Sequence, residues 1–288
     1  MQRISDYTAQ LGEGALWNNR SGELYWVDIE AKRLLIYDPG TDTNRIFQFE
    51  MEIGTVVPAA GGRVLVALED GIYRFDPATG NRQLLAANPQ VAETRFNDGK
   101  CDPAGRFWVG TIDRQHTRPL ATLFRMGSDY TLQTMKRSVV ISNGITWSRD
   151  KTRMYYIDTR TQKVVQYNYD NQTGNISQPE DIIIVPPEMG RPDGCTLDAE
   201  GMLWIAMWAG GTVTRWRPGT GELLQKMEVP ALNVSSVAFG GPDLSTLYIT
   251  TARTGMTAAD NSRYPLAGGL FACKPGVQGI PACFFDGG

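Results

Sequence analysis

The chain has 288 residues, of which 42% are hydrophobic and 20% charged, and its 28 basic and 31 acidic side chains give a formal net charge of −3. This composition is typical of a globular protein, and no apolar run approaches the roughly 20 residues of a membrane-spanning helix. Because the sequence has no basic block, it argues against nucleic acid or an anionic membrane as a partner and favours a small molecule.

The N-terminus and the cysteines indicate the compartment. No apolar segment follows Arg3, so we expect no cleaved signal peptide and a cytoplasmic protein. The four cysteines lack CxxC spacing, and a chain of this length needs no disulfide scaffold, so we expect reduced core thiols, with a Cys273–Cys283 bridge as the alternative. We expect a monomer or a weak homo-oligomer.

Six short apolar-aromatic runs recur along the chain. In order they are ELYWVD (23–28), RVLVA (63–67), RFWVG (106–110), MYYID (154–158), MLWIA (202–206) and TLYIT (246–250). Their central residues are spaced by 39, 43, 48, 48 and 44 residues, which is the range of β-propeller blades. Turn sequences such as YDPGTD (37–42) and FDPATG (75–80) follow the runs. Because Pro fixes φ and Gly allows positive φ, we expect them to be hairpin connections.

The longest stretch without Gly or Pro, residues 145–173, is the only place for a long helix. From Val165 to Asp170 it alternates apolar and polar side chains, which is the period of a strand. We therefore predict an all-β protein, a six-bladed β-propeller with four antiparallel strands per blade, forming one domain over residues 1–288. A large sandwich or two stacked β-domains are the alternatives.

Four of the six runs are preceded by a carboxylate or carboxamide that Gly follows at once or after one residue. These residues are Glu13, Asn97, Asn143 and Asp193, at 13, 11, 13 and 11 residues before the centres of their runs. Singly, each is an ordinary turn former. In a propeller this offset corresponds to the loop that leads into the innermost strand, so the four would meet at one face near the axis. Four oxygen donors there suit a hard divalent cation.

The loops between second and third strands reach the same face. They provide candidate wall residues, namely His116, Asp158, Trp208 and Tyr264. His116 is the only histidine, which excludes a His-rich zinc site, and it is either a substrate contact or a solvated side chain. Arg95 would hold an oxygen-rich substrate through forked hydrogen bonds, with a salt bridge to a loop acid as the alternative. We expect Asp98 and Lys100 to support the turn.

The chain resembles the SMP-30/gluconolactonase/regucalcin family of six-bladed propellers in LGEGALW, RFNDGKCDPAGRFWVGT, SNGITWS, PDGCTLDAEGMLWIAMWAGG and AFGGPDLSTLYITTA, which lie between residues 11 and 271. The resemblance implies a metal-dependent lactonase that opens a sugar lactone to the aldonic acid. It also implies metal ligands at Glu13, Asn143 and Asp193 and substrate-binding residues at Arg95 and Asn97. The sequence does not select one sugar lactone.

One position departs from the family pattern. Gln115 stands where some relatives have a glutamate that contacts substrate, and a glutamine hydrogen-bonds but cannot act as a base. The resemblance therefore makes Gln115, like His116, a candidate substrate-binding residue. The substrate preference of relatives that carry the glutamate does not transfer to this protein.

The mechanistic hypothesis is that the metal polarises the lactone carbonyl while water attacks it, with Asp193 as ligand and general base. Coordination lowers the basicity of a carboxylate, so Asp158 or metal-bound hydroxide is the alternative proton acceptor. We expect one divalent ion, Ca²⁺, although Zn²⁺, Mn²⁺ and Fe²⁺ also accept oxygen ligands. The alternative functions are a calcium-binding regulatory protein of regucalcin type and an esterase or organophosphate hydrolase on the same metal site.

Overall fold

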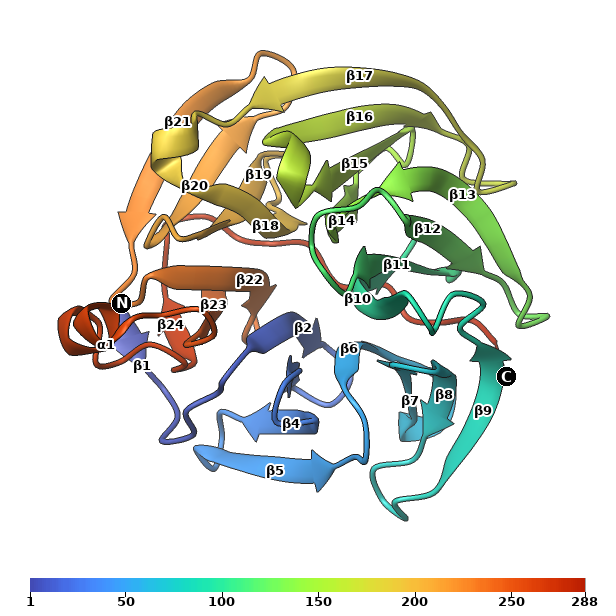
Figure 1. The fold of residues 1–288 in the computed structure, drawn as a ribbon, viewed down its shortest axis with the longest axis horizontal. Helices are drawn as coiled ribbons and strands as arrows, with labels where there is room; N and C mark the ends of the chain where they lie inside the picture. Colours follow the sequence, from blue (N-terminus) through green and yellow to red (C-terminus); the bar gives the residue numbers. More distant parts are fainter. Residues whose placement is uncertain (288) are drawn as a thin grey trace.

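Six four-stranded antiparallel sheets surround a central axis in a computed structural model that describes residues 1–287 (Figure 1). The first three blades are β2 (Gly12–Asn18), β3 (Glu23–Asp28), β4 (Arg33–Asp38) and β5 (Thr43–Gln48); β6 (Ile53–Pro58), β7 (Val64–Leu68), β8 (Gly71–Phe75) and β9 (Arg82–Ala87); and β10 (Thr94–Cys101), β11 (Phe107–Asp113), β12 (Ala121–Met126) and β13 (Leu132–Val139). In each blade the chain runs from the innermost strand outward.

The next two blades repeat this order. They are β14 (Ser142–Trp147), β15 (Arg153–Asp158), β16 (Lys163–Tyr169) and β17 (Ile176–Ile184); and β18 (Arg191–Leu197), β19 (Leu203–Trp208), β20 (Thr212–Arg217) and β21 (Glu222–Glu228). The last blade contains β22 (Asn233–Gly240), β23 (Thr246–Ala252), β24 (Phe271–Cys273) and β1 (Gln2–Arg3). The prediction of an all-β, six-bladed propeller with four antiparallel strands per blade is confirmed.

Helical structure is confined to connections. The α-helix α1 (Ala258–Arg263) lies in the long loop after β23, and its capping box joins Thr257 and Asp260. Three single 3₁₀ turns are η1 (Ala60–Gly62), η2 (Thr159–Thr161) and η3 (Pro187–Met189). No helix within residues 1–287 has the length and apolar character to cross a membrane. Residues 163–169 form β16, as their alternation predicts.

The two ends of the chain close the ring, which the repeat pattern did not predict. β1 pairs with β24, with Gln2 opposite Ala272 and Arg3 opposite Phe271. After β24 the chain crosses behind the innermost strands, the red trace in Figure 1. There the amide of Phe285 donates to the carbonyl of Pro58 at 2.9 Å. The ends therefore connect the last blade to the first half of the ring.

The central residues of the six runs form the core between blades. Trp26, Leu65, Trp108, Tyr156 and Trp204 are fully buried, and Tyr248 is 4% exposed. Burying a large apolar side chain contributes about 1.5–3 kcal/mol. In two blades the indole also has a buried partner, because Trp108 donates to Asp102 and Trp204 to Asp198, each at 2.9 Å. These aspartates belong to the first turn of their blade, so LDAEG (197–201) has a structural role.

The four oxygen donors lie inside the innermost strands, whereas the sequence analysis placed them in the loops before these strands. Each strand carries a β-bulge at the donor, seen as a register shift in β2, β10, β14 and β18. A bulge redirects a side chain without ending the strand, which explains how a strand residue can point toward the axis. Asp193 is therefore a bulge residue and not a turn residue.

Two of the glycines beside the donors, Gly144 and Gly194, are required by close backbone approach. Neither Gly144 nor Gly194 has a positive φ. A Cβ on Gly144 would lie 2.6 Å from the Asp193 carbonyl oxygen, and one on Gly194 would lie 2.8 Å from that of Ser235. In the second blade Gly54 occupies the bulge itself, and its Cβ would lie 2.4 Å from the Phe96 carbonyl oxygen. The innermost strands thus pack directly on one another.

Candidate active site

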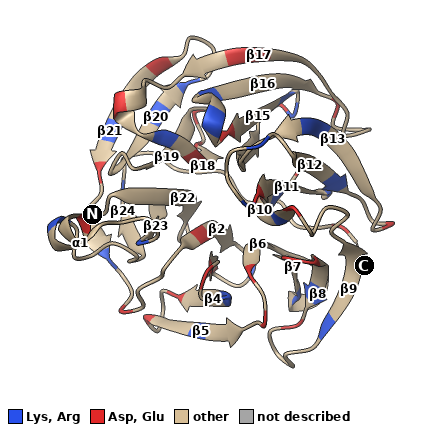
Figure 2. Cartoon of the chain, viewed as in Figure 1, with Lys and Arg blue, Asp and Glu red and all other residues tan. Residues whose placement is uncertain are grey.

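One cavity, of about 500 Å³, lies at the end of the axis where the innermost strands begin. The structure brings together in its wall the four oxygen donors and three further residues singled out from the sequence: Glu13, Asn97, Asn143, Asp193, Arg95, His116 and Trp208. Figure 2 shows an acidic segment on β2 beside the axis, while basic and acidic residues are interspersed over the rest of the blades.

Glu13 and Asp193 are the buried acids of this cavity, 7% and 3% exposed. Burial raises the pKa of Glu13 to about 8, and the charge of Asp98 adds to this effect. Burial also raises the pKa of Asp193 well above its ordinary value, with the charges of Glu13 and Asp98 adding to it. The Oδ1 atom of Asp193 is buried without a hydrogen-bond partner among residues 1–287. A cation would relieve both the repulsion and the unsatisfied oxygen.

A directed hydrogen-bond network fixes the Asn143 side chain. Its Nδ2 donates to Thr159 Oγ1 at 2.7 Å, and Thr159 Oγ1 donates to the Pro192 carbonyl oxygen at 2.9 Å. Because that carbonyl can only accept, the hydroxyl must accept from Asn143, and Asn143 Oδ1 points the other way. This oxygen accepts from Asn97 at 2.9 Å and keeps a second lone pair for a ligand.

Arg95 forms the salt bridge that was the alternative expectation, and its role in substrate binding stays a prediction. Its Nε lies 3.0 Å from Glu52 Oε2, which is the salt bridge, and its Nη1 donates to Asn97 Oδ1 at 2.9 Å. Arginine can only donate, so Asn97 must turn its oxygen toward Arg95 and its nitrogen toward Asn143. Arg95 is 8% exposed and also lines the cavity, so it orients Asn97 and remains available to a ligand.

His116 lies on the loop between β11 and β12, with φ +58°. Burial lowers the pKa of its imidazole, and the charges of Arg95 and Arg160 lower it further. These effects favour the neutral imidazole over the imidazolium. Asp113 anchors this loop: burial raises its pKa, but hydrogen bonds from the Arg118 side chain and from the amides of Arg118 and Thr117 outweigh this effect and hold it below the ordinary value.

Three residues singled out from the sequence lie outside the cavity wall. Gln115 is exposed on the loop one residue before His116, so its role as a substrate contact remains a prediction. The carboxylate of Asp158 accepts from the amides of Val140 and Ile141, both at 3.1 Å, and organises the loop before β14. Tyr264 packs against the core of the last blade. Because the carboxylate of Asp158 is bound by two amides and lies outside the cavity wall, the geometry does not support it as the alternative proton acceptor.

The donor set suits one hard cation. Within residues 1–287 no three His, Cys, Asp or Glu side chains come together as metal ligands. The oxygens available at the axis are two carboxylates, Glu13 and Asp193, and the amide oxygen of Asn143. Carboxylates and amide oxygens are the donors that Ca²⁺ accepts, and its irregular geometry leaves room for further ligands.

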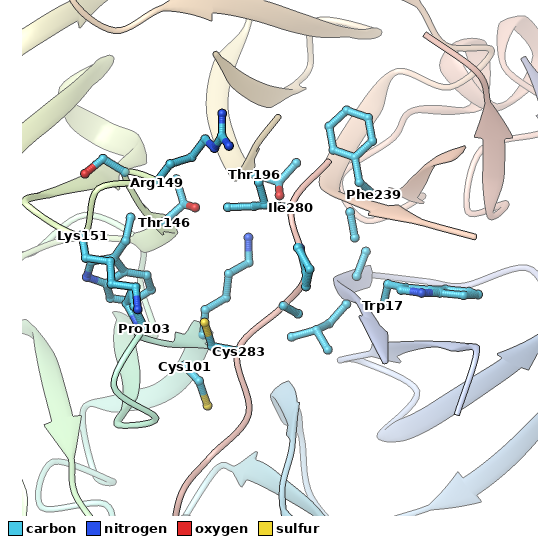
Figure 3. Close-up of a pocket in the computed structure, with 18 residues that line it drawn as sticks. Trp17, Cys101, Pro103, Thr146, Arg149, Lys151, Thr196, Phe239, Ile280 and Cys283 are labelled. Atoms are coloured by element: carbon cyan, nitrogen blue, oxygen red, sulfur yellow. The ribbon is translucent and has the colours of Figure 1, made fainter. Parts of the chain in front are cut away.

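A second cavity, of about 370 Å³, lies at the other end of the axis, where the innermost strands end (Figure 3). It is closed in part by residues 280–283 and is lined by Trp17, Phe239 and three cationic residues, Lys100, Arg149 and Lys151. Its wall contains no carboxylate. Cys101 and Cys283 also line it, and all four cysteines are free, as expected.

Sequence reasoning missed several residues of the first cavity. They are Glu30, Glu52, Arg114, Thr159, Arg160, Arg191 and Asn233. Thr159 and Arg160 follow Asp158 in the loop after the MYYID run, and Glu52 and Arg191 lie directly beside a bulge, a position that the sequence does not reveal. The dipeptide TR after the MYYID run was the available signal for Thr159 and Arg160.

The fold and the cavity define a six-bladed β-propeller with a buried oxygen-donor site at one end of its axis. The chain belongs to the SMP-30/gluconolactonase/LRE-like family, whose model matches residues 11–253. It is 37% identical to the pentonolactonase XacC of Haloferax volcanii, covering 97% of this chain and 96% of that protein.

Two further relatives extend over nearly the whole chain. The 6-deoxy-6-sulfogluconolactonase of Pseudomonas putida is 37% identical, with 96% of this chain and 95% of that protein covered. Among solved structures, a calcium-binding protein, regucalcin, from Agrobacterium tumefaciens superposes with a TM-score of 0.94 at 26% identity, covering 98% of this chain and 96% of that chain.

Proposed function

We propose that this protein is a metal-dependent hydrolase that opens the ring of a sugar lactone to the aldonic acid. The observation that carries the proposal is the convergence of Glu13, Asn143 and Asp193 in one cavity with Arg95 and Asn97. Relatives named as a pentonolactonase and a 6-deoxy-6-sulfogluconolactonase support a lactone as the substrate.

Glu13, Asn143 and Asp193 would hold the ion, and Ca²⁺ is the ion we propose. The buried, unpartnered Oδ1 of Asp193 supports this, as does the similarity to a protein described as calcium-binding. A divalent cation at this position supplies a Lewis acid that polarises the lactone carbonyl.

The chain's own residues bind the sugar and move the proton. Asp193 has two carboxylate oxygens, so one can serve the ion while the other accepts a proton from the attacking water. Arg95 donates to a sugar oxygen, and Asn97 Oδ1 accepts from a sugar hydroxyl through its second lone pair, because both hydrogens of Asn97 Nδ2 are bound by Ser142 and Asn143. The hydrogen bond of 2.9 Å between Arg95 and Asn97 orients both side chains. His116 hydrogen-bonds to a hydroxyl at the rim, and Gln115 is proposed as a further contact on the same loop.

The test is a pH-stat assay of the purified protein on a panel of aldonolactones, with metal analysis of the same sample. Asp193→Ala should lower turnover at least a hundredfold, because it removes both the ligand and the proton acceptor. Asp129→Asn, an exposed acid between β12 and β13, is the matched control and should leave turnover unchanged. Near wild-type hydrolysis by Asp193→Ala with metal still bound would refute the assignment of Asp193.

A calcium-binding regulatory role is the second candidate, supported by the similarity to the regucalcin structure. It needs the same three ligands but no turnover. Tight Ca²⁺ binding without hydrolysis of any lactone in the panel would favour it. A phosphotriester in the same panel tests the organophosphate hydrolase alternative.

A further inference from the structure

The rim of the acidic cavity carries four arginines, and they differ in how their charge is balanced. Arg95 pairs with Glu52, with 3.0 Å between Nε and Oε2, and Arg114 pairs with Glu69. Arg160 and Arg191 have no acidic partner among residues 1–287. Two guanidinium groups at the cavity mouth are therefore uncompensated.

The two unpaired arginines come from adjacent blades and line the same cavity. Arg160 belongs to η2 in the fourth blade, and Arg191 is the first residue of β18 in the fifth. Their chain neighbours are directly bonded, because Thr159 Oγ1 donates to the Pro192 carbonyl oxygen at 2.9 Å. The same hydroxyl holds Asn143, so the pair of arginines stands beside the proposed metal ligands.

Arg160 is held in position, which makes it a binding group and not a freely moving charge. Its Nε donates to the His116 carbonyl oxygen at 2.9 Å, across to the loop of the third blade. This contact leaves the two terminal nitrogens without a protein acceptor among the described residues. Both nitrogens are free to make a forked contact with an anionic oxygen pair.

Charge is distributed unevenly around the mouth. Glu30 follows β3 in the first blade and Glu52 precedes β6 in the second, and both lie near enough to Arg95 to raise its pKa against the larger, lowering effect of burial. In a ring of six the first blade faces the fourth. An elongated substrate therefore meets carboxylates on one side of the mouth and unpaired guanidinium groups on the other.

We propose that Arg160 and Arg191 form an anion subsite that selects sugar lactones carrying a phosphate, sulfonate or carboxylate on the exocyclic end of the chain. This inference rests on the proposed lactonase function. The lactone carbonyl reaches the buried Glu13, Asn143 and Asp193, while the charged substituent stays at the exposed rim between the two arginines. The two ends of the substrate lie at different depths in the cavity, so the anionic substituent does not compete with the lactone carbonyl for the metal site.

We expect the two arginines to affect substrate binding more than the chemical step. Contacts to a remote substituent that are equal in the ground state and the transition state lower KM and leave kcat unaltered. Charge-assisted hydrogen bonds exceed neutral ones, but exposure and salt weaken them. We expect the two arginines together to supply about a tenfold preference, and we expect it to shrink as ionic strength rises.

The experiment compares D-glucono-δ-lactone with its 6-phosphate at low ionic strength. The proteins are the wild type, Arg160→Gln, Arg191→Gln and the double variant. Arg137→Gln is the matched control, since Arg137 is an exposed arginine of the edge strand β13 and does not line the cavity. We expect the ratio of kcat/KM values, phosphorylated over neutral, to fall about tenfold in the double variant through KM, and to stay constant in Arg137→Gln.

An equal loss on both lactones, or an unchanged ratio, would overturn the anion subsite while the lactonase function stands. If the wild type hydrolyses neither lactone, the panel of aldonolactones decides the lactonase function, and calorimetry with gluconate and 6-phosphogluconate decides the subsite separately. Tighter binding of 6-phosphogluconate that is lost in the double variant supports the subsite. Equal binding of the two acids refutes it. Unchanged melting temperatures of the variants show that folding is intact.

Discussion

Asn97 Nδ2 donates to Asn143 Oδ1 at 2.9 Å, which joins a proposed substrate-binding residue directly to a proposed metal ligand. The direction of this bond is fixed from both sides. Asn97 Nδ2 also donates to the Ser142 carbonyl oxygen at 2.8 Å, and Asn97 Oδ1 accepts from Arg95. A substitution of Arg95, Asn97 or Asn143 should therefore also change the orientation of the other two side chains, and we expect metal and substrate binding to be coupled.

Removing the Thr159 hydroxyl should weaken metal binding without touching a ligand. In Thr159→Val the Asn143 nitrogen loses its acceptor at 2.7 Å, so the amide is no longer held with its oxygen toward the axis. Loss of such a supporting hydrogen bond typically costs 10–100-fold, and we expect about tenfold in Ca²⁺ affinity by calorimetry. Thr159→Ser keeps the hydroxyl and should bind like the wild type. Equal weakening in both variants would show that the methyl group and not the hydroxyl matters.

The metal-free protein should become less stable as pH rises. The pKa of Glu13 is about 8 in the folded protein, against an ordinary value of 4.5. Between these values the folded state binds more protons than the unfolded state, so the free energy of unfolding falls with increasing pH. We expect a lower melting temperature at pH 8 than at pH 5.5 in the presence of a chelator, and a smaller difference in Glu13→Gln. A melting temperature that rises over this range would contradict the buried, unpaired acid.

Excess Ca²⁺ is the control for this pH dependence. An ion that binds only the folded state stabilises it by mass action, and it binds the deprotonated carboxylates. The rise in melting temperature on adding Ca²⁺ should therefore be larger at pH 8 than at pH 5.5.

Gly144→Ala should destabilise the protein and disturb the site together. The new Cβ would lie 2.6 Å from the Asp193 carbonyl oxygen and 2.8 Å from Cys195 Sγ, so β14 and β18 must move apart. Overpacking of this kind costs about 1–3 kcal/mol, which thermal denaturation would detect. Gly219→Ala is the matched control, because nothing lies within 4 Å of its Cβ. Equal melting temperatures for the two variants would refute the close approach.

Two adjacent residues on the loop after β11 should differ in their effect on substrate binding. His116 lines the cavity, whereas Gln115 is exposed and outside its wall. We expect His116→Ala to raise KM for a lactone about three- to tenfold, the value of one lost hydrogen bond, with kcat little changed. Gln115→Ala should raise KM less. A larger effect at Gln115 would show that the loop closes over the bound substrate.

The pattern of strands could be read from the sequence because it repeats. The six apolar runs, with Trp26, Trp108 and Trp204 at their centres, recur at blade spacing, and the same offset that placed Asn97 also placed Asp193. Repetition averages out local ambiguity: a single Asp-Gly is only a turn signal, but four donors at matching positions indicate a common point in space. The fold class and the four oxygen donors were therefore predictable.

The bulges, the closing strand and the rim were not predictable, since each depends on contacts between distant segments. Gln2 pairs with Ala272 only because the ring brings both ends together. Gln115 and His116 look equivalent in the sequence, yet only His116 lines the cavity. Arg160 and Arg191 are ordinary charged residues until their neighbours Thr159 and Pro192 meet.

The sequence alone determined which residues repeat, because hydrophobic periodicity and turn chemistry are local properties of the chain. Only the tertiary structure decided which side chains interact electrostatically or through a hydrogen bond, because the energies of these interactions depend on distances between residues of different blades. Asp193 illustrates both. Its spacing from Trp204 in the sequence identifies it as an oxygen donor. Its burial in the structure and the charge of Glu13 raise its pKa, and a bound cation would offset both effects.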